Sequence, residues 1–328
     1  MLAMKNTAIV VDNLTKIYKG ASGDEIRAVD GISFEVEEAE VFGLLGPNGA
    51  GKTSTLEILE GLRVPTSGHA QVLGMEIGPN GVTDRARLTA SIGVQLQESA
   101  YFEELSLVET LKLLGSFYPR SKDARELLAT VNLLDKASSR YGQLSGGQAR
   151  RFSIAAALVN DPKVLFLDEP TTGLDPQARR NLWELIEEIK CSQRVTVVLT
   201  THYMEEAEIL CDRVGIIDGG KVVALDAPRT LISSLGGSYA ASVAATGIDT
   251  ESVDAILQDC GVEGRINEDL AESERAVVHL DFVSPSPASV FKVLDRLAAF
   301  GAEISDLSVR NASLEDVFLT LTGKALRD

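Results

Sequence analysis

The sequence predicts an α/β domain followed by a smaller α+β domain, and three observations support this. Apolar segments rich in β-branched residues alternate with segments whose apolar residues recur every three or four positions. A glycine-rich turn over residues 46–53 joins a predicted buried strand to a predicted helix. Around residues 226–237 the composition shifts to Pro, Ser and Gly, which marks a boundary. We therefore expect domains over residues 5–232 and 238–328, and a chain of 328 residues is long enough for two cores.

The first domain begins with predicted strands. Residues 8–11 and 32–36 carry β-branched side chains, and the glycines between them predict turns. Residues 40–45 predict a buried strand, and residues 52–62 have the spacing of a helix.

The middle of this domain has a helical pattern from about residue 85 to residue 141. Apolar residues recur there at three- and four-residue steps, namely Leu107, Leu111, Leu114 and Phe117. We expect a helical subdomain near residues 86–145. After it, the sequence predicts a helix over 149–158, strands over 164–167 and 195–199, and a hairpin over 214–224 that turns at Asp218-Gly219-Gly220.

The second domain alternates strands and helices. Strands are predicted over 239–244, 263–266, 276–282 and 304–309, and helices over 252–257, 287–300 and 314–321. This β-α-β-β-α-β order predicts a ferredoxin-like sandwich. The segment has no phosphate loop, no metal-ligand spacing and no carboxylates paired for catalysis. We therefore expect this domain to function through its surface, either by holding two copies of the chain together as a dimer brace or by regulating closure of the first domain. We favour the dimer brace.

Composition and charge exclude several classes of function. The net charge of -17 argues against a general nucleic-acid binder, which needs a basic footprint, although loop amides can still bind a local anion. The cysteines, Cys191, Cys211 and Cys260, form no CxxC pair, which suits a reducing cytoplasm. The sequence has no apolar run near the ~20 residues of a membrane span and no signal-peptide core. We expect a cytoplasmic protein that reaches a membrane only through a partner.

The glycine-rich turn fits the phosphate-loop pattern G-x-x-x-x-G-K-[ST]. Its residues are Gly46, Pro47, Asn48, Gly49, Ala50, Gly51, Lys52 and Thr53, and Ser54 follows. Glycines allow the backbone to wrap closely around phosphate oxygens, and the following helix adds its positive dipole end. Lys52 is placed to reach the β- and γ-phosphates, and the Thr53 hydroxyl is placed to ligate Mg²⁺. The pattern predicts a site for ATP or another nucleoside triphosphate.

A second candidate site lies where the predicted strand 164–167 ends in two carboxylates, Asp168 and Glu169. In a parallel sheet such ends open onto the ligand crevice. Asp168 is suited to hold Mg²⁺, and Glu169 to orient or deprotonate the attacking water. The alternative is a solvated strand terminus, which the nearby phosphate loop disfavours.

The segment Leu144-Ser145-Gly146-Gly147-Gln148 resembles the signature motif of ABC (ATP-binding cassette) ATPases. It is another glycine loop that opens a helix, hence a second phosphate-facing surface. The resemblance covers about residues 5–232. It implies a parallel phosphate-loop core that carries an antiparallel β element and a helical subdomain. It also implies that Ser145, Gly146, Gly147 and Gln148 complete the ATP site of a second copy in a head-to-tail dimer.

The resemblance extends to further single residues. Tyr18 resembles the aromatic residue that stacks on adenine, with a core tyrosine as the alternative. Gln97 resembles the glutamine that touches Mg²⁺ and the attacking water, with Gln95 as its rival. Asp175 lies in the loop that links the two sites, and His202 resembles the histidine that contacts the γ-phosphate.

The family also implies a partner. A cassette of this kind drives an integral-membrane permease from the cytoplasmic face of the membrane. The ending Ser313-Leu314-Glu315-Asp316-Val317-Phe318-Leu319 resembles ATPase subunits of antibiotic and multidrug export systems. Two alternatives are a cytosolic mechanochemical ATPase of the same superfamily and an inactive regulatory cassette. The acidic charge and single cassette disfavour the first, and the presence of Lys52 and Glu169 disfavours the second.

Overall fold

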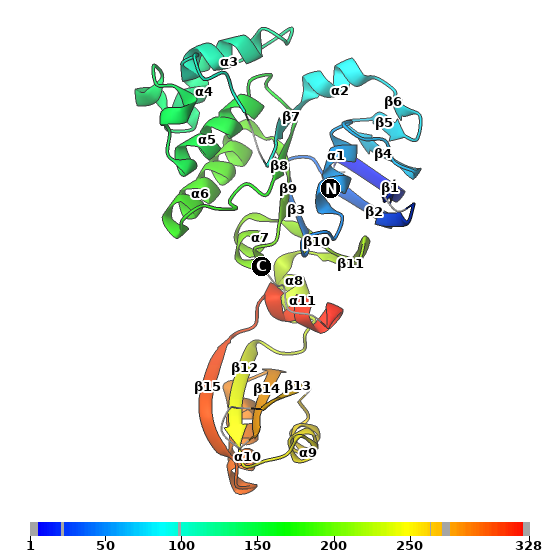
Figure 1. The fold of residues 1–328 in the computed structure, drawn as a ribbon, viewed down its shortest axis with the longest axis vertical. Helices are drawn as coiled ribbons and strands as arrows, with labels where there is room; N and C mark the ends of the chain where they lie inside the picture. The colour runs from blue at the N-terminus through cyan, green and yellow to red at the C-terminus, as the bar shows by residue number, and fades with distance from the viewer. Residues whose placement is uncertain (1–5, 21–22, 98–99, 263, 271–275, 324–328) are drawn as a thin grey trace, which may run out of the picture. The chain divides into compact units, whose positions relative to one another are not determined.

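The computed structural model describes residues 6–20, 23–97, 100–262, 264–270 and 276–323. The chain divides into two compact units, and the division falls between Ala227 and Pro228. Figure 1 shows the elements of both units in chain order.

The first unit is built on a six-stranded sheet. Its strands in spatial order are β11 (Lys221–Asp226), β10 (Arg213–Asp218), β3 (Val41–Leu45), β9 (Thr196–Thr201), β8 (Val164–Asp168) and β7 (Ile92–Gln95). The neighbours from β10 to β7 are parallel, and β11 pairs antiparallel at one edge. Strands β3, β8 and β9 are buried along their whole length, as is typical of parallel strands covered on both faces. Their carboxyl ends therefore share one edge of the sheet.

Strand β7 corrects the sequence prediction. The sequence predicts continuous helical structure from residue 85 onward, but Ile92–Gln95 pairs with β8. Four residues are too few for a strand to be distinguished from the helical pattern around it. Gly93 is required there, because a Cβ atom at this position would lie 2.0 Å from the carbonyl oxygen of Ala157.

Helical elements precede and follow β7 along the chain. They are α2 (Arg85–Ser91), α3 (Leu107–Gly115), α4 (Ala124–Thr130), the 3₁₀ turns η1 (Leu134–Lys136) and η2 (Tyr141–Gln143), and α5 (Gly146–Ala157). Leu107 and Leu111 are buried as the helical spacing predicts. Phe117 is not part of that apolar face, since α3 ends before it and its side chain is 72% exposed.

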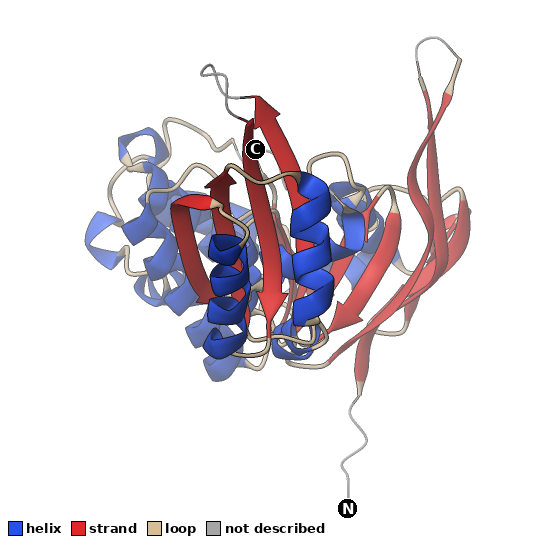
Figure 2. Cartoon of the chain, turned by 90° about the horizontal axis from the view of Figure 1, so that it is seen from below, coloured by secondary structure: helices blue, strands red, loops and turns tan. Residues whose placement is uncertain are grey.

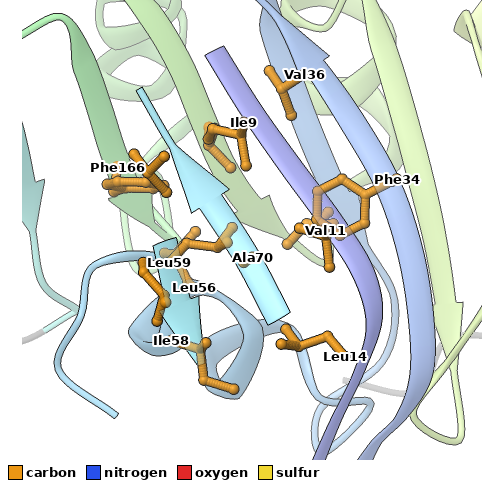
Figure 3. Close-up of a cluster of buried hydrophobic side chains, with 14 of the residues drawn as sticks. Ile9, Val11, Leu14, Phe34, Val36, Leu56, Ile58, Leu59, Ala70 and Phe166 are labelled. Carbon is orange, nitrogen blue, oxygen red and sulfur yellow. The ribbon is translucent and has the colours of Figure 1, made fainter. Parts of the chain in front are cut away.

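A five-stranded antiparallel sheet covers the other side of the phosphate-loop helix. Its strands in spatial order are β2 (Glu25–Glu37), β1 (Thr7–Lys19), β4 (Ser67–Val72), β5 (Met75–Gly78) and β6 (Gly81–Val82). The helix α1 (Lys52–Leu59) packs between this sheet and the parallel sheet. Figure 3 shows the shared core, in which Ile9 and Val11 of β1 lie with Leu56 and Leu59 of α1 and Phe166 of β8. This core fixes α1, and thereby the loop that precedes it.

Two further helices complete the first unit, α6 (Pro176–Gln193) and α7 (Met204–Leu210). The Asp175 side chain accepts a hydrogen bond from the Ala178 amide and caps α6, and Pro176 occupies the first helical turn. The helix α7 follows β9 directly, so residues 202 and 203 form the whole connection.

The second unit begins with a helix that the sequence did not predict, α8 (Pro228–Ser233), and then has the predicted alternation of elements. They are β12 (Tyr239–Thr246), α9 (Thr250–Cys260), β13 (Gly264–Leu270), β14 (Ala276–Ser284), α10 (Pro287–Ala299), β15 (Glu303–Asn311) and α11 (Leu314–Thr322). The strands form one antiparallel sheet in the order β13-β14-β12-β15. The helices α9 and α10 lie against one face of this sheet (Figure 2), and their apolar residues form a separate core with those of β12 and β14.

A buried carboxyl group follows the end of α1. Glu60 is 7% exposed, it lines a cavity of about 170 Å³ with Arg85 and Thr89, and its Oε1 has no hydrogen-bond partner among the described residues. Burial raises the pKa of Glu60 to about 8, and the nearby charges of Asp168 and Glu57 act in the same direction.

This raised pKa predicts a pH-dependent stability. The protonated Glu60 stabilises the fold fully below the unfolded-state pKa near 4.5, and this contribution is lost as the pH rises through about 8. Glu60→Gln keeps the shape without the titration. We therefore expect the melting temperature of the variant to exceed that of the wild type by several degrees at pH 8.5, with a smaller difference at pH 6. Thermal unfolding at both pH values tests this, with the exposed Glu184→Gln as control. Parallel pH curves for Glu60→Gln and wild type would contradict it.

Candidate functional site

The phosphate loop follows β3 and is held by its surroundings. Gly51 has a φ of +105°, and a Cβ atom there would lie 2.1 Å from the carbonyl oxygen of Ala28. A Cβ atom at Gly46 would lie 2.2 Å from the carbonyl oxygen of Ile217. Both positions therefore require glycine, because a neighbouring backbone carbonyl leaves no room for a Cβ atom, whether or not a ligand is bound.

Lys52 is buried within this loop. Its Nζ donates hydrogen bonds to the carbonyl oxygens of Gly46 at 2.8 Å and Pro47 at 3.1 Å, and it lies 3.7 Å from Glu169 Oε1. Burial lowers the pKa of Lys52, and the carboxylates of Glu169 and Asp168 oppose that shift. The ammonium group is thus a partly desolvated charge, whose interaction with an anion is stronger than it would be in bulk water.

Asp168 ends β8 beside the phosphate-loop helix. Its Oδ1 accepts hydrogen bonds from Thr200 Oγ1 at 2.5 Å and from Thr53 Oγ1 at 3.3 Å. Burial raises the pKa of Asp168, although both hydroxyl bonds favour the charged form. Thr53 and Asp168, far apart in the sequence, thus present adjacent oxygen atoms of the kind that Mg²⁺ prefers.

Glu169 has an unusual backbone conformation. Its φ is +46°, which is uncommon outside glycine, and its amide donates to Thr200 Oγ1 at 2.9 Å. The carboxylate accepts a hydrogen bond from Thr172 Oγ1 at 3.0 Å, and its Oε2 lies 3.3 Å from His202 Nδ1. Strained residues of this kind cluster at functional sites, where the surrounding contacts hold them in place.

These side chains share one crevice of about 800 Å³. Its lining includes Gly49, Lys52, Thr53, Gln97, Glu169 and His202. It also includes residues that the sequence analysis did not select, among them Ile26, Ala28 and Tyr203. The structure therefore brings the phosphate loop together with residues at the ends of β8 and β9, which lie more than a hundred positions further along the sequence.

The two candidate glutamines differ sharply in environment. Gln97 is exposed and lines the crevice, whereas Gln95 is 1% exposed and its Nε2 donates to the carbonyl oxygen of Leu96. The backbone carbonyl of Gln97 accepts a hydrogen bond from Arg150 of α5 at 3.1 Å. Gln97 thus lines the crevice, and its backbone is hydrogen-bonded to Arg150 of α5, the helix that begins at residues 145–148.

Tyr18 lies beside the phosphate-loop helix. Its hydroxyl is 3.1 Å from Ser54 Oγ, and the cationic groups of Lys16 and Arg63 lie 5.2 Å and 5.5 Å from its ring centroid. The ring is half-buried and is not among the described residues that line the crevice. Tyr18 is therefore hydrogen-bonded to Ser54, a residue that lines the crevice.

The signature residues lie apart from this crevice. Ser145 caps α5, accepting a hydrogen bond from the Gln148 amide, while the Gln148 side chain accepts one from the Ser145 amide. None of residues 145–148 is among the described residues lining the crevice, and Ser145 and Gly146 are exposed. Asp175 is also exposed, at the start of α6.

Sequence reasoning missed Thr200, Thr172 and Arg150. Thr200 connects Asp168 to the Glu169 amide, Thr172 binds the Glu169 carboxylate, and Arg150 binds the loop at Gln97. The one sequence signal for Thr200 was the pair of threonines that follows the apolar residues of strand β9. In the structure Thr200 is completely buried. A hydroxyl at a buried strand end indicates a partner, but the sequence does not identify it.

Comparison with known proteins gives a consistent picture. A family model described as ABC transporter matches residues 29–172. The linearmycin resistance ATP-binding protein LnrL of Bacillus subtilis is 37% identical over 323 residues, which is 97% of this chain and 99% of LnrL. ABC transporter A family member 7 of Arabidopsis thaliana is 37% identical over 327 residues, which is 95% of this chain and 33% of that protein. The chain thus spans about a third of the length of the plant relative.

Solved structures align with about two thirds of the chain. A dimeric ATP-binding cassette in a post-hydrolysis state, bound to ADP and Pi, aligns with a TM-score of 0.59 and 28% identity over 67% of this chain and 98% of that one. The cbiO1 protein of Clostridium perfringens, part of the ABC transporter complex cbiONQ, aligns with a TM-score of 0.62 and 26% identity over 70% of this chain and 92% of that one.

Proposed function

Because the chain belongs to the ABC transporter family, as an ATP-binding cassette that hydrolyses ATP, we propose that it powers export through a separate membrane permease. The observation that carries this proposal is the crevice that Lys52, Thr53 and Glu169 line at the carboxyl ends of the parallel strands, with Asp168 hydrogen-bonded to Thr53 beside it.

Within that crevice we assign separate tasks to the side chains. Lys52 exchanges its hydrogen bonds to the loop carbonyls for bonds to the β- and γ-phosphates of ATP. The backbone amides of residues 46–53 surround these phosphates. Glu169 accepts a proton from the attacking water, oriented by His202, Thr172 and the Thr200 hydroxyl. Gln97 contacts the water and the metal ion from its exposed loop, and Ser54, which lines the crevice, binds the nucleotide together with Tyr18.

The residues fit Mg²⁺ as the metal ion. Thr53 and Asp168 offer neighbouring oxygen ligands, and among the described residues no cluster of three His, Cys, Asp or Glu side chains could hold a metal by itself. A magnesium ion held by few protein oxygens relies on substrate phosphates for the rest, as is usual for this metal. Bound there, the ion supplies positive charge that stabilises the transferring phosphoryl group.

We infer that the site is completed in trans. Residues 145–148 are not among the described residues that line the crevice of their own chain, and Ser145 and Gly146 are exposed at the start of α5, where a helix dipole favours a phosphate. Asp175 is exposed at the start of α6 and serves as part of the loop linking two sites. The dimeric cassette bound to ADP and Pi supports dimerisation, and we propose that two copies pair head to tail around two ATP molecules.

The transport role rests on the relatives and on the chain itself. LnrL is named for linearmycin resistance, which supports export of a drug, lipid or similar compound. No helix in the described part of the chain is long and apolar enough to span a bilayer. We place the chain on the cytoplasmic face of the membrane, bound to an integral permease, and we assign no nucleic-acid partner because of its net charge of -17.

The domains we propose remain 5–232 and 238–328. The strand order β13-β14-β12-β15 supports a ferredoxin-like second domain.

Glu169→Gln tests the catalytic assignment. The amide preserves the shape of the side chain but cannot accept the proton, so we expect ATP binding to persist while turnover falls by ~10² or more. Steady-state ATPase rates and nucleotide affinity are measured on the variant, with the exposed Glu188→Gln as a matched control. Near-normal turnover in Glu169→Gln would remove its assigned role.

A mixing experiment tests completion in trans. Lys52→Ala and Ser145→Arg each inactivate both sites of a homodimer, whereas a mixed dimer combines one intact site with one that carries both defects. We expect partial recovery of ATPase activity on mixing. The measurement is activity against mixing ratio, with mixed dimers demonstrated by differently tagged chains. Absence of recovery in such dimers would count against the composite site.

A third experiment tests attachment to a permease. The loop after Gln97 carries the exposed Glu103 and Glu104, and the family resemblance implies that this region couples the ATP site to the permease. With the neighbouring permease co-expressed, reversing both charges should release the chain from membranes while ATP binding persists. Reversal of Glu184 and Glu188 on α6 is the control. A wild-type chain that stays wholly cytosolic under these conditions would overturn the transport proposal.

A further inference from the structure

Strand β15 is an exposed edge in the second unit. It pairs with β12 along one side only, and each of its nine residues is exposed. In the described part of the chain no strand pairs with its outer side, and Figure 1 shows it outermost in its sheet. An unpaired edge of this length is a template for another strand, and proteins normally shorten, charge or cover such edges.

The side chains on one face of β15 are those of a covered strand. Leu307 and Val309 lie opposite Val243 and Ala241 of β12, which belong to the core under α9 and α10. Yet Leu307 is 43% exposed and Val309 is 45% exposed. The core therefore extends to the edge strand, but the two helices do not cover it there.

The opposite face of the same segment is polar. Asp306, Ser308 and Arg310 alternate with the two apolar residues. Arg310 donates to both carboxylate oxygens of Asp316, at 2.7 Å and 2.8 Å, and this pair raises the pKa of Arg310. The guanidinium group is thereby held in a defined position beside the sheet. The pairing with β12 is regular from Asp306 onward, and its one irregularity lies between Asp306 and Ile304.

The segment Asp306-Leu307-Ser308-Val309-Arg310 is complementary to itself. When it meets an identical antiparallel strand across a two-fold axis at Ser308, Asp306 faces Arg310 at both ends and Leu307 faces Val309 on both sides. Residues opposite each other in an antiparallel pair share a face, so both charge pairs lie on the polar face and both apolar pairs on the other.

Neighbouring registers lack this match. A pair centred on Leu307 places Asp306 against Ser308 and Val309 against Ser305. A pair centred on Val309 places Arg310 against Ser308 and Leu307 against Asn311. In both, each apolar residue outside the axis meets a polar side chain and the opposite charges are not opposed.

We propose that β15 is a self-association surface, which binds β15 of a second copy of this chain in the antiparallel register centred on Ser308. The two four-stranded sheets then form one continuous sheet of eight strands, and the partner strand covers Leu307 and Val309. The contact is isologous, as expected for a two-fold dimer. It involves no nucleotide and no residue of the composite ATP site.

Disulfide trapping in the full-length chain tests the register. Ser308→Cys places two cysteines directly opposite, with Cα atoms about 4.5–5.5 Å apart, which suits a disulfide. Asp306→Cys, on the same face, lies four residues from its own image, about 13 Å along the strand. Under mild oxidation without nucleotide, we expect Ser308→Cys to give at least fivefold more covalent dimer on non-reducing gels than Asp306→Cys or the wild type, whose native cysteines are the blank.

Charge reversal gives a second, independent readout. In the Ser308→Cys chain, Asp306→Lys sets a lysine against Arg310 of the other copy, and we expect at least fivefold less covalent dimer. Glu303→Lys reverses a charge on the same strand outside the complementary segment and should leave the yield unchanged. Circular dichroism and ATPase activity confirm that the variants fold.

Two results would overturn this inference: a Ser308→Cys yield no higher than the blank, or equal yields from Ser308→Cys and Asp306→Cys. The failure is distinguishable from failure of the composite ATP site. Recovery of ATPase activity in the Lys52→Ala and Ser145→Arg mixture would still support that site when β15 does not pair.

Discussion

The Thr200 hydroxyl is the contact on which the site depends. It donates to the Asp168 carboxylate at 2.5 Å and accepts from the Glu169 amide at 2.9 Å, so one atom joins the ends of β8 and β9. Asp168 in turn reaches Thr53 of α1, while Glu169 faces Lys52 and His202. One buried hydroxyl group therefore links the ends of β8 and β9, and through Asp168 it is connected to α1, which the apolar core holds in place.

Burial of charge at this edge has an electrostatic consequence. Desolvation raises the pKa of Asp168 and lowers that of Lys52, and the opposite charges partly offset both shifts. Taking charges out of water is costly unless they are paired, so such a cluster is not a means of stabilising the fold. Its value lies in keeping one ammonium group and two carboxylates in a region of weak solvent screening, where they act strongly on phosphate and metal charges.

The two units solve the problem of sheet edges differently. In the first unit β11 is the edge strand on one side of the sheet, and the functional groups lie at the carboxyl ends of the parallel strands. In the second unit the helices α9 and α10 cover β12 and β14 but leave the side chains of β15 exposed. A strand that is apolar on one face and self-complementary in charge on the other can associate in one register, which distinguishes pairing from non-specific aggregation.

The sequence alone determined the class of the first unit and most of its site. Gly46 to Thr53 and the apolar strand ending in Asp168 and Glu169 are local patterns, and their chemistry follows from adjacent residues. Helix caps such as Ser145 and Asp175 are equally local. The alternation of elements in the second unit followed from periodicity, because each strand and helix there is long enough to show its own repeat.

Only the tertiary structure decided the rest. The strand β7 is too short to show a period, and its pairing depends on the approach of α5 that Gly93 allows. Only the fold shows that Gln95 is buried while Gln97 lines the crevice, a difference in burial that no local pattern encodes. Thr200 became a site residue only through partners more than thirty positions away, and Glu60 acquired its raised pKa only through burial. Likewise, the segment 306–310 is an ordinary amphipathic strand in the sequence, and it became a candidate interface only when the fold left it at an uncovered edge.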